Sequence, residues 1–490
     1  MTQKMAKLLS AVIALCLLVP LLSGCEKKQD DEFGLDPKNP TSITIWHYYN
    51  GLQQEQFDKL LLEFNETVGR EMGIIVEGRN KNTVSDLADS SIAALRGDDG
   101  AEEIPDMFAA YPGTAYKANQ LGKVADLSKY FTQEELDEYV EDYLKESNID
   151  GTGALKLFPT AKSTEVMMIN QTDWQVFADA QGVSVDDVST WESLAKTAEK
   201  YYAYTDALTP DVPNDGRAFF GRDAMANYMI IGAKQLGLQF VTLEDGKITV
   251  NEDKDSIRRL WECYYVPYVK GYYLSHGRYR SDDAQVGEII AMVCSTPGST
   301  YFPQVVTLDD EHAYRVEALV LPVPNFEGTD PYIVQQGAGM VVVKSEEKKE
   351  YACSVFLKWF TQEERKVAFS GNSGYLPVKK AANDFNSISD LFDDEEKKTN
   401  ATIFDVLEVA VSEINTYQLY VSEPYDTEEE VRNFLDSFMQ DTAQAAHDAA
   451  AQRIEAGEDR DAVLSEYVSD AAFDAWYETF ISGLRNVAGV

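Results

Sequence analysis

The chain has 490 residues, of which 43 are Lys or Arg and 83 are Asp or Glu, so its formal charge is 43 − 83 = −40 at neutral pH. No run of basic residues offers the clustered positive charge that binding to nucleic acid requires, so we do not expect a nucleic-acid partner. With 44% hydrophobic and 11% aromatic residues, the chain can fill large cores, and its length suggests roughly two to three domain-sized units.

The first 25 residues have the pattern of an exported lipoprotein. Lys4 and Lys7 precede an apolar run over residues 8–22, and the segment ends in Leu-Ser-Gly-Cys at Cys25. The run is too short to span about 30 Å of hydrocarbon, and it closes on small residues as a cleavage site does. This ending resembles a bacterial lipobox, so we expect removal of a signal peptide, residues 1–24, and lipidation of Cys25. The alternative is an ordinary secretory cleavage that leaves a free cysteine.

The region after the signal predicts an anchored but not membrane-spanning protein. Residues 25–40 are polar and are interpreted as a tether, and no later segment has about 18 consecutive apolar residues. Three further cysteines, Cys263, Cys294 and Cys353, form no Cys-x-x-Cys pair, which argues against zinc and redox motifs. Each lies among apolar neighbours and is expected to be a buried thiol; one disulfide between two of them is the alternative.

Strands alternate with helices from residue 42 onward. The predicted strands are residues 42–46, 73–77, 104–110, 166–169, 289–293 and 340–343. Helical spacing of apolar residues is found around 57–64, 84–95, 191–202 and 346–360, and in the last hundred residues, with a stripe at Val431, Phe434, Leu435 and Phe438. This alternation indicates α/β layers with mainly parallel sheets. Ligands of such sheets bind beyond the carboxyl ends of strands, which favours the loops at 46–51, 78–82 and 111–114.

Common catalytic and metal-binding motifs are missing from the sequence. It contains no Gly-x-Ser-x-Gly, no His-Glu-x-x-His and no Gly-x-x-x-x-Gly-Lys. The four histidines are dispersed, so no metal site is expected. Residues 251–255 resemble half a calcium loop, but Ser256 stands where glycine is needed, and the run also fits the start of a helix. The acid-rich stretches 133–146 and 393–396 are most simply solvated faces.

An ordered set of short motifs is more specific. The opening strand ends in Trp-His-Tyr-Tyr-Asn-Gly at 46–51, and further motifs follow at 106–111, 162–170, 190–194, 337–344 and 373–378. Together with the lipobox, this set resembles the extracellular solute-binding proteins of bacterial ABC importers, in the carbohydrate and sn-glycerol 3-phosphate group that includes maltose-binding protein. The resemblance covers residues 41–380, whereas the acidic part 381–490 shows only a generic helical ending.

The resemblance implies a two-lobe α/β fold of the periplasmic-binding-protein type (type II), with hinge crossings between the lobes and a helical C-terminal part. Crossings are expected near 163–166, 334–337 and 375–377. The expected boundaries are 41–164 plus 335–368 for lobe one and 165–334 plus 369–490 for lobe two. The implied protein is not an enzyme and needs no cofactor. It is a monomeric lipoprotein on the outer side of the cell membrane, extracellular or periplasmic, which captures a mono- or oligosaccharide between its lobes and delivers it to the transmembrane subunits of a permease.

The proposed ligand site follows from the chemistry of a polyol. Aromatic rings cover its C–H faces, while amides, hydroxyls and backbone groups bind its hydroxyls. The candidates at strand ends and crossings are Trp46, Tyr48, Tyr49, Asn50, Asn80, Tyr111, Lys162, Ser163, Thr164, Thr296, Gly298, Gln336, Gly337 and Tyr375. Core packing is the alternative for each aromatic residue. Asp106 and Glu165 would either accept sugar hydroxyls or pair structurally.

Two other functions stay open at this point. An sn-glycerol 3-phosphate ligand would need a fixed cation, for which Lys162 and Arg365 are the candidates. With 83 acidic residues, some carboxylate pair could lie about 5–9.5 Å apart by chance, so a surface glycan hydrolase is the further alternative.

Overall fold

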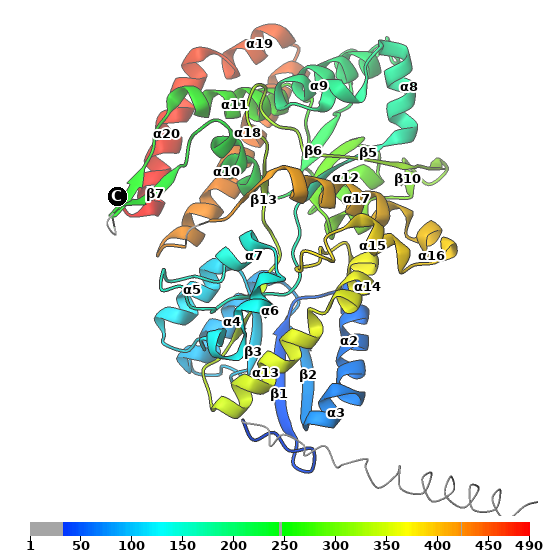
Figure 1. The fold of residues 1–490 in the computed structure, drawn as a ribbon. Coiled ribbons are helices and arrows are strands. Elements are labelled where there is room, and N and C mark those ends of the chain that lie inside the picture. Colours follow the sequence, from blue (N-terminus) through cyan, green and yellow to red (C-terminus); the bar gives the residue numbers. More distant parts are fainter. Residues whose placement is uncertain (1–32, 245–246, 423) are drawn as a thin grey trace, which may run out of the picture.

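The computed structural model describes residues 33–244, 247–422 and 424–490, and they form the expected two-lobe α/β fold. In Figure 1 the first lobe, mostly blue and cyan, lies below the second lobe, which runs from green to red. The expected signal peptide, residues 1–24, and the expected lipidation site, Cys25, lie outside the described residues. Both therefore stay predictions.

A five-stranded sheet of order β2-β1-β3-β14-β4 forms the first lobe. Its strands are β1 (Thr41–His47), β2 (Ile74–Asn80), β3 (Met107–Ala110), β4 (Phe158–Pro159) and β14 (Gly339–Val342). The helices around it are α2 (Gly51–Glu66), α3 (Val68–Met72), α4 (Val84–Arg96), α5 (Pro112–Gln120), η2 (Leu127–Tyr130), α6 (Gln133–Asp137), α7 (Glu141–Lys145), α13 (Glu347–Phe360) and α14 (Glu363–Ser373). In α2 the buried side chains are Phe57, Leu60, Leu61 and Phe64, as the helical spacing predicts.

The second lobe contains a four-stranded sheet of order β12-β5-β9-β6. These strands are β5 (Glu165–Asn170), β6 (Phe220–Arg222), β9 (Ala291–Ser295) and β12 (Ala318–Leu321). The surrounding helices are α8 (Gln171–Gln181), η3 (Val185–Val188), α9 (Trp191–Asp206), α10 (Met225–Gln235), α11 (Lys254–Val269), α12 (Arg280–Gln285) and η4 (Gly298–Tyr301). Two hairpins complete this part, β7 (Val241–Glu244) with β8 (Lys247–Val250) and β10 (Val305–Thr307) with β11 (Ala313–Arg315).

Both sheets are mixed, so the prediction of mainly parallel sheets is wrong. In the first lobe β1 runs parallel to β2 and β3, but β14 runs antiparallel to β3 and β4. In the second lobe β5 runs antiparallel to both β9 and β12, and only β6 is parallel to β9. The cause is that β5 and β14 begin directly after a crossing between the lobes. They therefore start at the edge where strands such as β1 and β9 end.

The C-terminal region contributes to both the second lobe and the space between the lobes. It contains α15 (Phe385–Asp390), α16 (Asp394–Thr399), α17 (Ala401–Thr416), β15 (Gln418–Tyr420), α18 (Glu428–Glu455), α19 (Arg460–Tyr467) and α20 (Asp470–Ala488). Strand β15 pairs in parallel with β13 (Tyr332–Val334). Helix α18 buries Val431, Leu435 and Met439 against the second lobe, and its N-terminal end points toward the first lobe (Figure 1).

Three chain segments meet at the expected hinge. The backbones of Ser163 and Gln336 exchange two hydrogen bonds, of 3.0 and 2.8 Å, and those of Lys162 and Leu376 exchange two of 3.3 and 2.6 Å. Gly337 adopts a φ of +88°, and a Cβ there would overlap the carbonyl oxygen of Ala161. The crossing segments are therefore held together by backbone contacts that leave no room for a side chain at Gly337.

The packing around residues 33–40 and 369–378 bears on the expected boundaries of the tether and the lobes. Phe33 stacks on Tyr351 with ring centroids 4.2 Å apart, and Leu35 is buried in the core of the first lobe. The expected tether thus includes residues that pack. Phe369 and Tyr375 also join the core of the first lobe, although the expected boundary lies after residue 368. The precise limits of the lobes stay a prediction.

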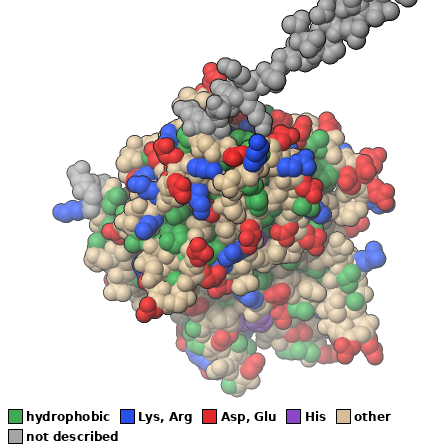
Figure 2. All heavy atoms as spheres, turned by 90° about the horizontal axis from the view of Figure 1, so that it is seen from below, with side chains coloured by type: hydrophobic (Ala, Val, Ile, Leu, Met, Phe, Trp, Pro, Cys, Tyr) green, Lys and Arg blue, Asp and Glu red, His purple; other side chains and the backbone are tan. Residues whose placement is uncertain are grey.

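The surface and the cysteines agree with a globular body. Figure 2 shows acidic and basic side chains interspersed on the face of the first lobe seen from below.

Cys263, Cys294 and Cys353 are buried and unpaired in the described structure, so the alternative of a disulfide between two of them is wrong. Across the described ranges we find no helix with the length and apolarity needed to cross a membrane. The half calcium loop is a helix start, because Asp253 accepts a hydrogen bond from the backbone of Ser256 and caps α11.

Candidate functional site

A cavity of about 320 Å³ lies where both lobes and the second crossing meet. Its volume is within the range of about 300–1,000 Å³ that is usual for small-molecule sites. The first lobe supplies part of α4, Glu146 and the start of α5, and the crossing supplies residues 334–336. The opposite wall comes from α10, from the segment around β15 and from the first turns of α18. A solute held here would contact both lobes at once.

Helices α5 and α18 also meet at the rim of the cavity. The ammonium of Lys117 lies 2.5 Å from Glu429 Oε2. Gln120 Nε2 donates to Asp426 Oδ1 at 2.6 Å, and the hydroxyl of Tyr116 donates to the same oxygen at 3.2 Å. Helix α5 buries Ala115 and Ala118 in the core of the first lobe, and α18 buries Val431 and Leu435 in the core of the second lobe. These contacts therefore join the two lobes.

A polar network leads from the first crossing to the cavity wall. Arg222 Nη2 binds both carboxylate oxygens of Glu165, at 2.8 and 2.9 Å. Asn227 Nδ2 donates to Glu165 Oε1 at 2.8 Å, and Arg432 Nη2 donates to Asn227 Oδ1 at 2.8 Å. Glu165 therefore pairs structurally, which is one of the two roles expected for it. The network also holds Asn227 and Arg432 where they line the cavity.

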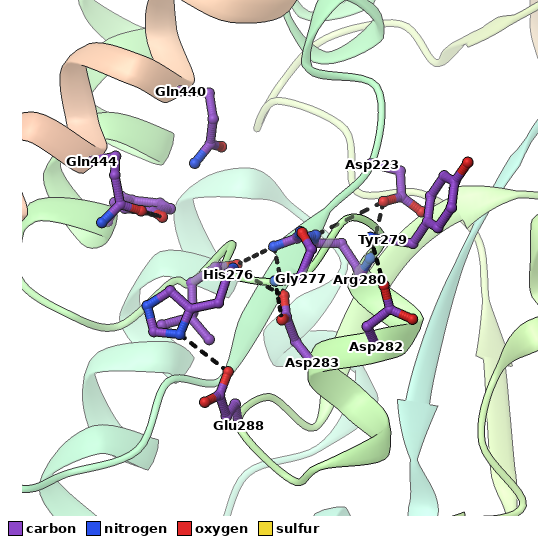
Figure 3. Close-up of polar contacts among 12 residues, drawn as sticks. Asp223, His276, Gly277, Tyr279, Arg280, Asp282, Asp283, Glu288, Gln440 and Gln444 are labelled. Carbon is purple, nitrogen blue, oxygen red and sulfur yellow. Dashed lines mark hydrogen bonds and ion pairs between the residues drawn. The ribbon is translucent and has the colours of Figure 1, made fainter.

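The end of β6 is held by a second buried network, drawn in Figure 3. Arg280 is 3% exposed and lies 2.6 Å from Asp283 Oδ2, while its backbone N–H donates to Asp223 Oδ1 at 3.1 Å. Burial raises the pKa of Asp223 to about 6, although the contacts with Arg280 lower it in part. Because Asp223 directly follows Arg222, this network supports the strand end that carries the Arg222–Glu165 pair.

Three of the predicted aromatic residues cluster beside the crossings. The hydroxyl of Tyr375 lies 3.5 Å from that of Tyr48, which accepts a hydrogen bond of 3.4 Å from the backbone of Ala338. Burial raises the pKa of Tyr48 to about 12, and the neighbouring hydroxyls of Tyr375 and Tyr111 lower it in part. Tyr111 lines the cavity. The hydroxyl of Tyr48 neighbours that of Tyr111, whereas Tyr48 and Tyr375 are not among the residues that line the cavity.

The other two predicted aromatic residues, like Tyr375, are buried in the core of the first lobe. Tyr49 is 2% exposed and packs edge-on against Tyr375 with ring centroids 5.8 Å apart. Trp46 has no exposed surface, and the ammonium of Lys81 lies 3.8 Å from its ring centroid. Trp46 is buried because β1 lies inside its sheet, between β2 and β3, whereas Tyr49 follows β1 and is buried against Phe57, Phe369 and Tyr375. We therefore do not place either ring at the ligand-binding surface.

The predicted polar residues are divided between the cavity and the hinge. Gln336 lines the cavity, and its Oε1 has no hydrogen-bond partner in the described structure. The other residues contact neighbouring parts of the protein, although the buried side-chain hydroxyls of Thr164 and Thr296 have no hydrogen-bond partner in the described structure. Asn80 Nδ2 donates to the carbonyl oxygen of Tyr49 and to Asn50 Oδ1, Lys162 pairs with Glu146, and Gly337 lies in the second crossing. Ser163, Thr164 and Thr296 are buried at the first crossing, and Gly298 donates to Ser295 Oγ. Asp106 binds Lys349 and the backbone of Thr44.

Several residues that line the cavity are not predicted from the sequence. Arg432 and Glu428 lie on a helix of which the sequence reveals only the buried stripe, and Asn227 has no motif around it. Glu146 belongs to the acid-rich stretch 133–146, yet its side chain is only 8% exposed because it pairs with Lys162. The interpretation of that whole stretch as a solvated face is thus wrong for Glu146. A polar residue next to an apolar stripe, as in α18, is the one signal that could have indicated Arg432.

A second, larger hollow of about 770 Å³ lies within the second lobe. It is lined by residues of one lobe, including Tyr202, His276, His312 and His447. Among the described residues no group of three or more His, Cys, Asp or Glu side chains is arranged to hold a metal ion. This hollow contains none of the predicted site residues and does not touch the crossings, so a solute there would not couple the two lobes.

Comparison with known proteins identifies relatives of this architecture. Residues 60–402 match the family described as bacterial extracellular solute-binding protein. No curated protein matches the chain.

Solved structures resemble the chain over nearly their whole length. The cyclic alpha-maltosyl-1,6-maltose binding protein from Arthrobacter globiformis is 17% identical, with a TM-score of 0.63 over 91% of this chain and 100% of that one. UgpB from Mycobacterium tuberculosis in complex with glycerophosphocholine is also 17% identical, with a TM-score of 0.64 over 88% and 100%. The substrate-binding protein Lmo0181 from Listeria monocytogenes in complex with cycloalternan is 14% identical, with a TM-score of 0.62 over 92% and 100%. At these identities the likeness shows the fold.

Proposed function

The chain belongs to the family of bacterial extracellular solute-binding proteins, and we propose that it captures a mono- or oligosaccharide between its lobes and delivers it to the transmembrane subunits of an ABC importer. The observation that carries the proposal is the cavity of about 320 Å³ whose walls come from both lobes and the second crossing. A solute that contacts both walls favours the closed arrangement by its differential affinity for it.

The lining of the cavity suits a carbohydrate. Tyr111 offers a ring, Gln336, Asn227 and Asn433 offer amides, and Glu428 offers a carboxylate. Rings cover the C–H face of a sugar, and amides and carboxylates bind its hydroxyls. Two of the structural neighbours named above bind cyclic oligosaccharides, which supports this choice of ligand class.

An sn-glycerol 3-phosphate ligand is the second candidate, because UgpB binds a glycerophosphodiester. The two cationic side chains expected to bind this phosphate, Lys162 and Arg365, are paired with other residues. Lys162 is fully buried against Glu146, and Arg365 pairs with Glu63 at 3.3 Å while its guanidinium lies 4.4 Å from the ring centroid of Trp359. Among the described residues that line the cavity, Arg432 is the one cationic side chain. Carbohydrate is therefore the better-supported class.

The anchor at Cys25 and the permease are further parts of the proposal. The lipobox supports acylation of Cys25, which would hold a monomeric protein on the outer side of the membrane. Metabolic labelling with an alkyne palmitate tests it: we expect label on the wild type in the membrane fraction and none on Cys25→Ser. Equal labelling of both proteins would contradict lipidation at this residue.

The function is tested by thermal shift on ligand-free mature protein against neutral mono- and oligosaccharides, sugar acids and glycerol phosphates. We expect at least one carbohydrate to raise the melting temperature saturably and to be recovered unchanged. The family and the structural neighbours are binding proteins, so we expect no turnover. A shift with no member of the panel would refute carbohydrate capture, and new reducing ends in a glycan mixture would favour the hydrolase alternative.

A further inference from the structure

Glu428 holds an unusual position in the cavity between the lobes. It is the first residue of α18 and lines the cavity from the second lobe. Its carboxylate lies against the start of α5 in the first lobe, since a Cβ built on Gly113 would be 2.6 Å from Glu428 Oε2. The two lobes thus meet at a carboxylate and a glycine, and a Cβ at Gly113 would require the Glu428 carboxylate to shift from this position.

The start of α5 is where an anionic group of a solute would be expected to bind. The first backbone N–H groups of a helix point outward, and the helix dipole places partial positive charge there. Pro112 occupies the first turn of α5, and no described side chain on its own lobe caps this end. Glu428 therefore already places a negative charge at the position that a phosphate or carboxylate would need.

Carboxylates outnumber cations in the lining of the cavity, where Glu146, Glu428 and Glu429 lie with Arg432 as the one cationic side chain among the described lining residues. Lys117 pairs with Glu429 and Lys162 pairs with Glu146, whereas Arg432 donates to the neutral amide oxygen of Asn227. Burial raises the pKa of Glu428, while Arg432 lowers it and Glu146 raises it further. A phosphate or carboxylate in this cavity would thus meet three carboxylates and one guanidinium, so like charge prevails there. Juxtaposed like charges act against the wrong partner.

We propose that Glu428 is a specificity-determining residue that admits uncharged carbohydrates to the cavity and excludes phosphorylated and acidic ones. The inference rests on the proposed function, because it takes this cavity as the solute site. It goes beyond that function by assigning discrimination between ligand classes to one carboxylate. An uncharged sugar hydroxyl can donate a hydrogen bond to Glu428, whereas a phosphate oxygen cannot do so when ionised.

The test compares Glu428→Gln with wild type and with Glu430→Gln. The control removes the same charge two residues further along α18, from an exposed side chain 3.9 Å from Lys117 and outside the cavity lining. Isothermal titration measures binding of the best neutral sugar of the thermal-shift panel, of sn-glycerol 3-phosphate and of glucuronate. Glu428→Ala replaces Glu428→Gln if that variant fails to fold, as judged by circular dichroism.

We expect the wild type to bind the neutral sugar more tightly than either anion, and we expect Glu428→Gln to reduce this preference by about tenfold or more. The Glu430→Gln control should keep the preference within about twofold of wild type, as is usual for exposed charges. A wild type that binds sn-glycerol 3-phosphate as tightly as the sugar, or a preference unaffected by Glu428→Gln, overturns this inference alone. A wild type that binds no carbohydrate overturns the proposed function as well.

Discussion

Replacing Lys162 tests how the hinge is stabilised. Its side chain has no exposed surface, its ammonium pairs with Glu146, which is 8% exposed, and it donates to the carbonyl oxygen of Gly337 at 3.1 Å. The variant Lys162→Met fills most of the volume but leaves the Glu146 carboxylate buried without its cation. Breaking one side of a buried ion pair costs about 3–5 kcal/mol, and the Gly337 carbonyl loses a donor worth about 1 kcal/mol. We expect a loss of this size in the free energy of unfolding.

Urea denaturation followed by tryptophan fluorescence measures this loss. The double variant Lys162→Met/Glu146→Gln removes the stranded charge, so it should recover at least half of it. Lys145→Met is the matched control, because Lys145 is 58% exposed and pairs with Asp142, 36% exposed, on the surface of α7; it should cost less than about 1 kcal/mol. If Lys162→Met were no more destabilising than the control, or if the double variant were as unstable as the single one, the buried pair would not stabilise the hinge.

Three further changes test other parts of the structure. Gly337→Ala should destabilise by more than about 2 kcal/mol in urea, because φ is +88° and a Cβ has no room; Gly328→Ala, with φ of +78° and no described atom within 4 Å of its Cβ, should cost only about 1 kcal/mol, and equal losses would contradict a close approach at the hinge. Burial lowers the pKa of His47 to about 4, so between pH 6.5 and 4 the unfolded chain binds a proton that the folded chain does not, and the free energy of unfolding should fall by about 3 kcal/mol. Urea titrations at several pH values should show that His47→Asn lacks this fall. The same pH dependence in the variant and the wild type would refute the assignment to His47. Lys366 is 1% exposed without a hydrogen-bond partner among the described residues, and burial lowers its pKa. Lys366→Met should therefore raise the free energy of unfolding at pH 7 by about 1–3 kcal/mol. A lower free energy of unfolding in the variant would show that the amine stabilises the fold.

The sequence predicts the fold class because local patterns determine it. The alternation in residues 42–46 and the helical spacing of Phe57 to Phe64 match β1 and α2 closely. Strand direction is different, because it depends on where the chain crosses between the lobes. The run at 340–343 looks the same whichever way it enters the sheet, so the antiparallel placement of β14 could not be read from it.

The site is predicted less completely than the fold. Tyr111 and Gln336 are found because strand ends and crossings mark them, and the structure places both at the cavity. Trp46 looks equivalent in sequence, yet it lies within β1 and not beyond the end of the strand, and it is buried. Arg432 and Glu428 reach the cavity because α18 packs against α10 and α11 with Val431 and Leu435 in the core of the second lobe, which turns these two polar residues toward the first lobe. That placement is a tertiary feature without a local signal.

The most direct test of the central claim is a crystal structure of the mature protein with the carbohydrate that gives the largest thermal shift. We predict electron density for the sugar between the start of α5 and the first turns of α18, in contact with Tyr111, Gln336 and Glu428. Density confined to the hollow lined by Tyr202 and His447 in the second lobe, with the cavity between the lobes empty, would contradict the account.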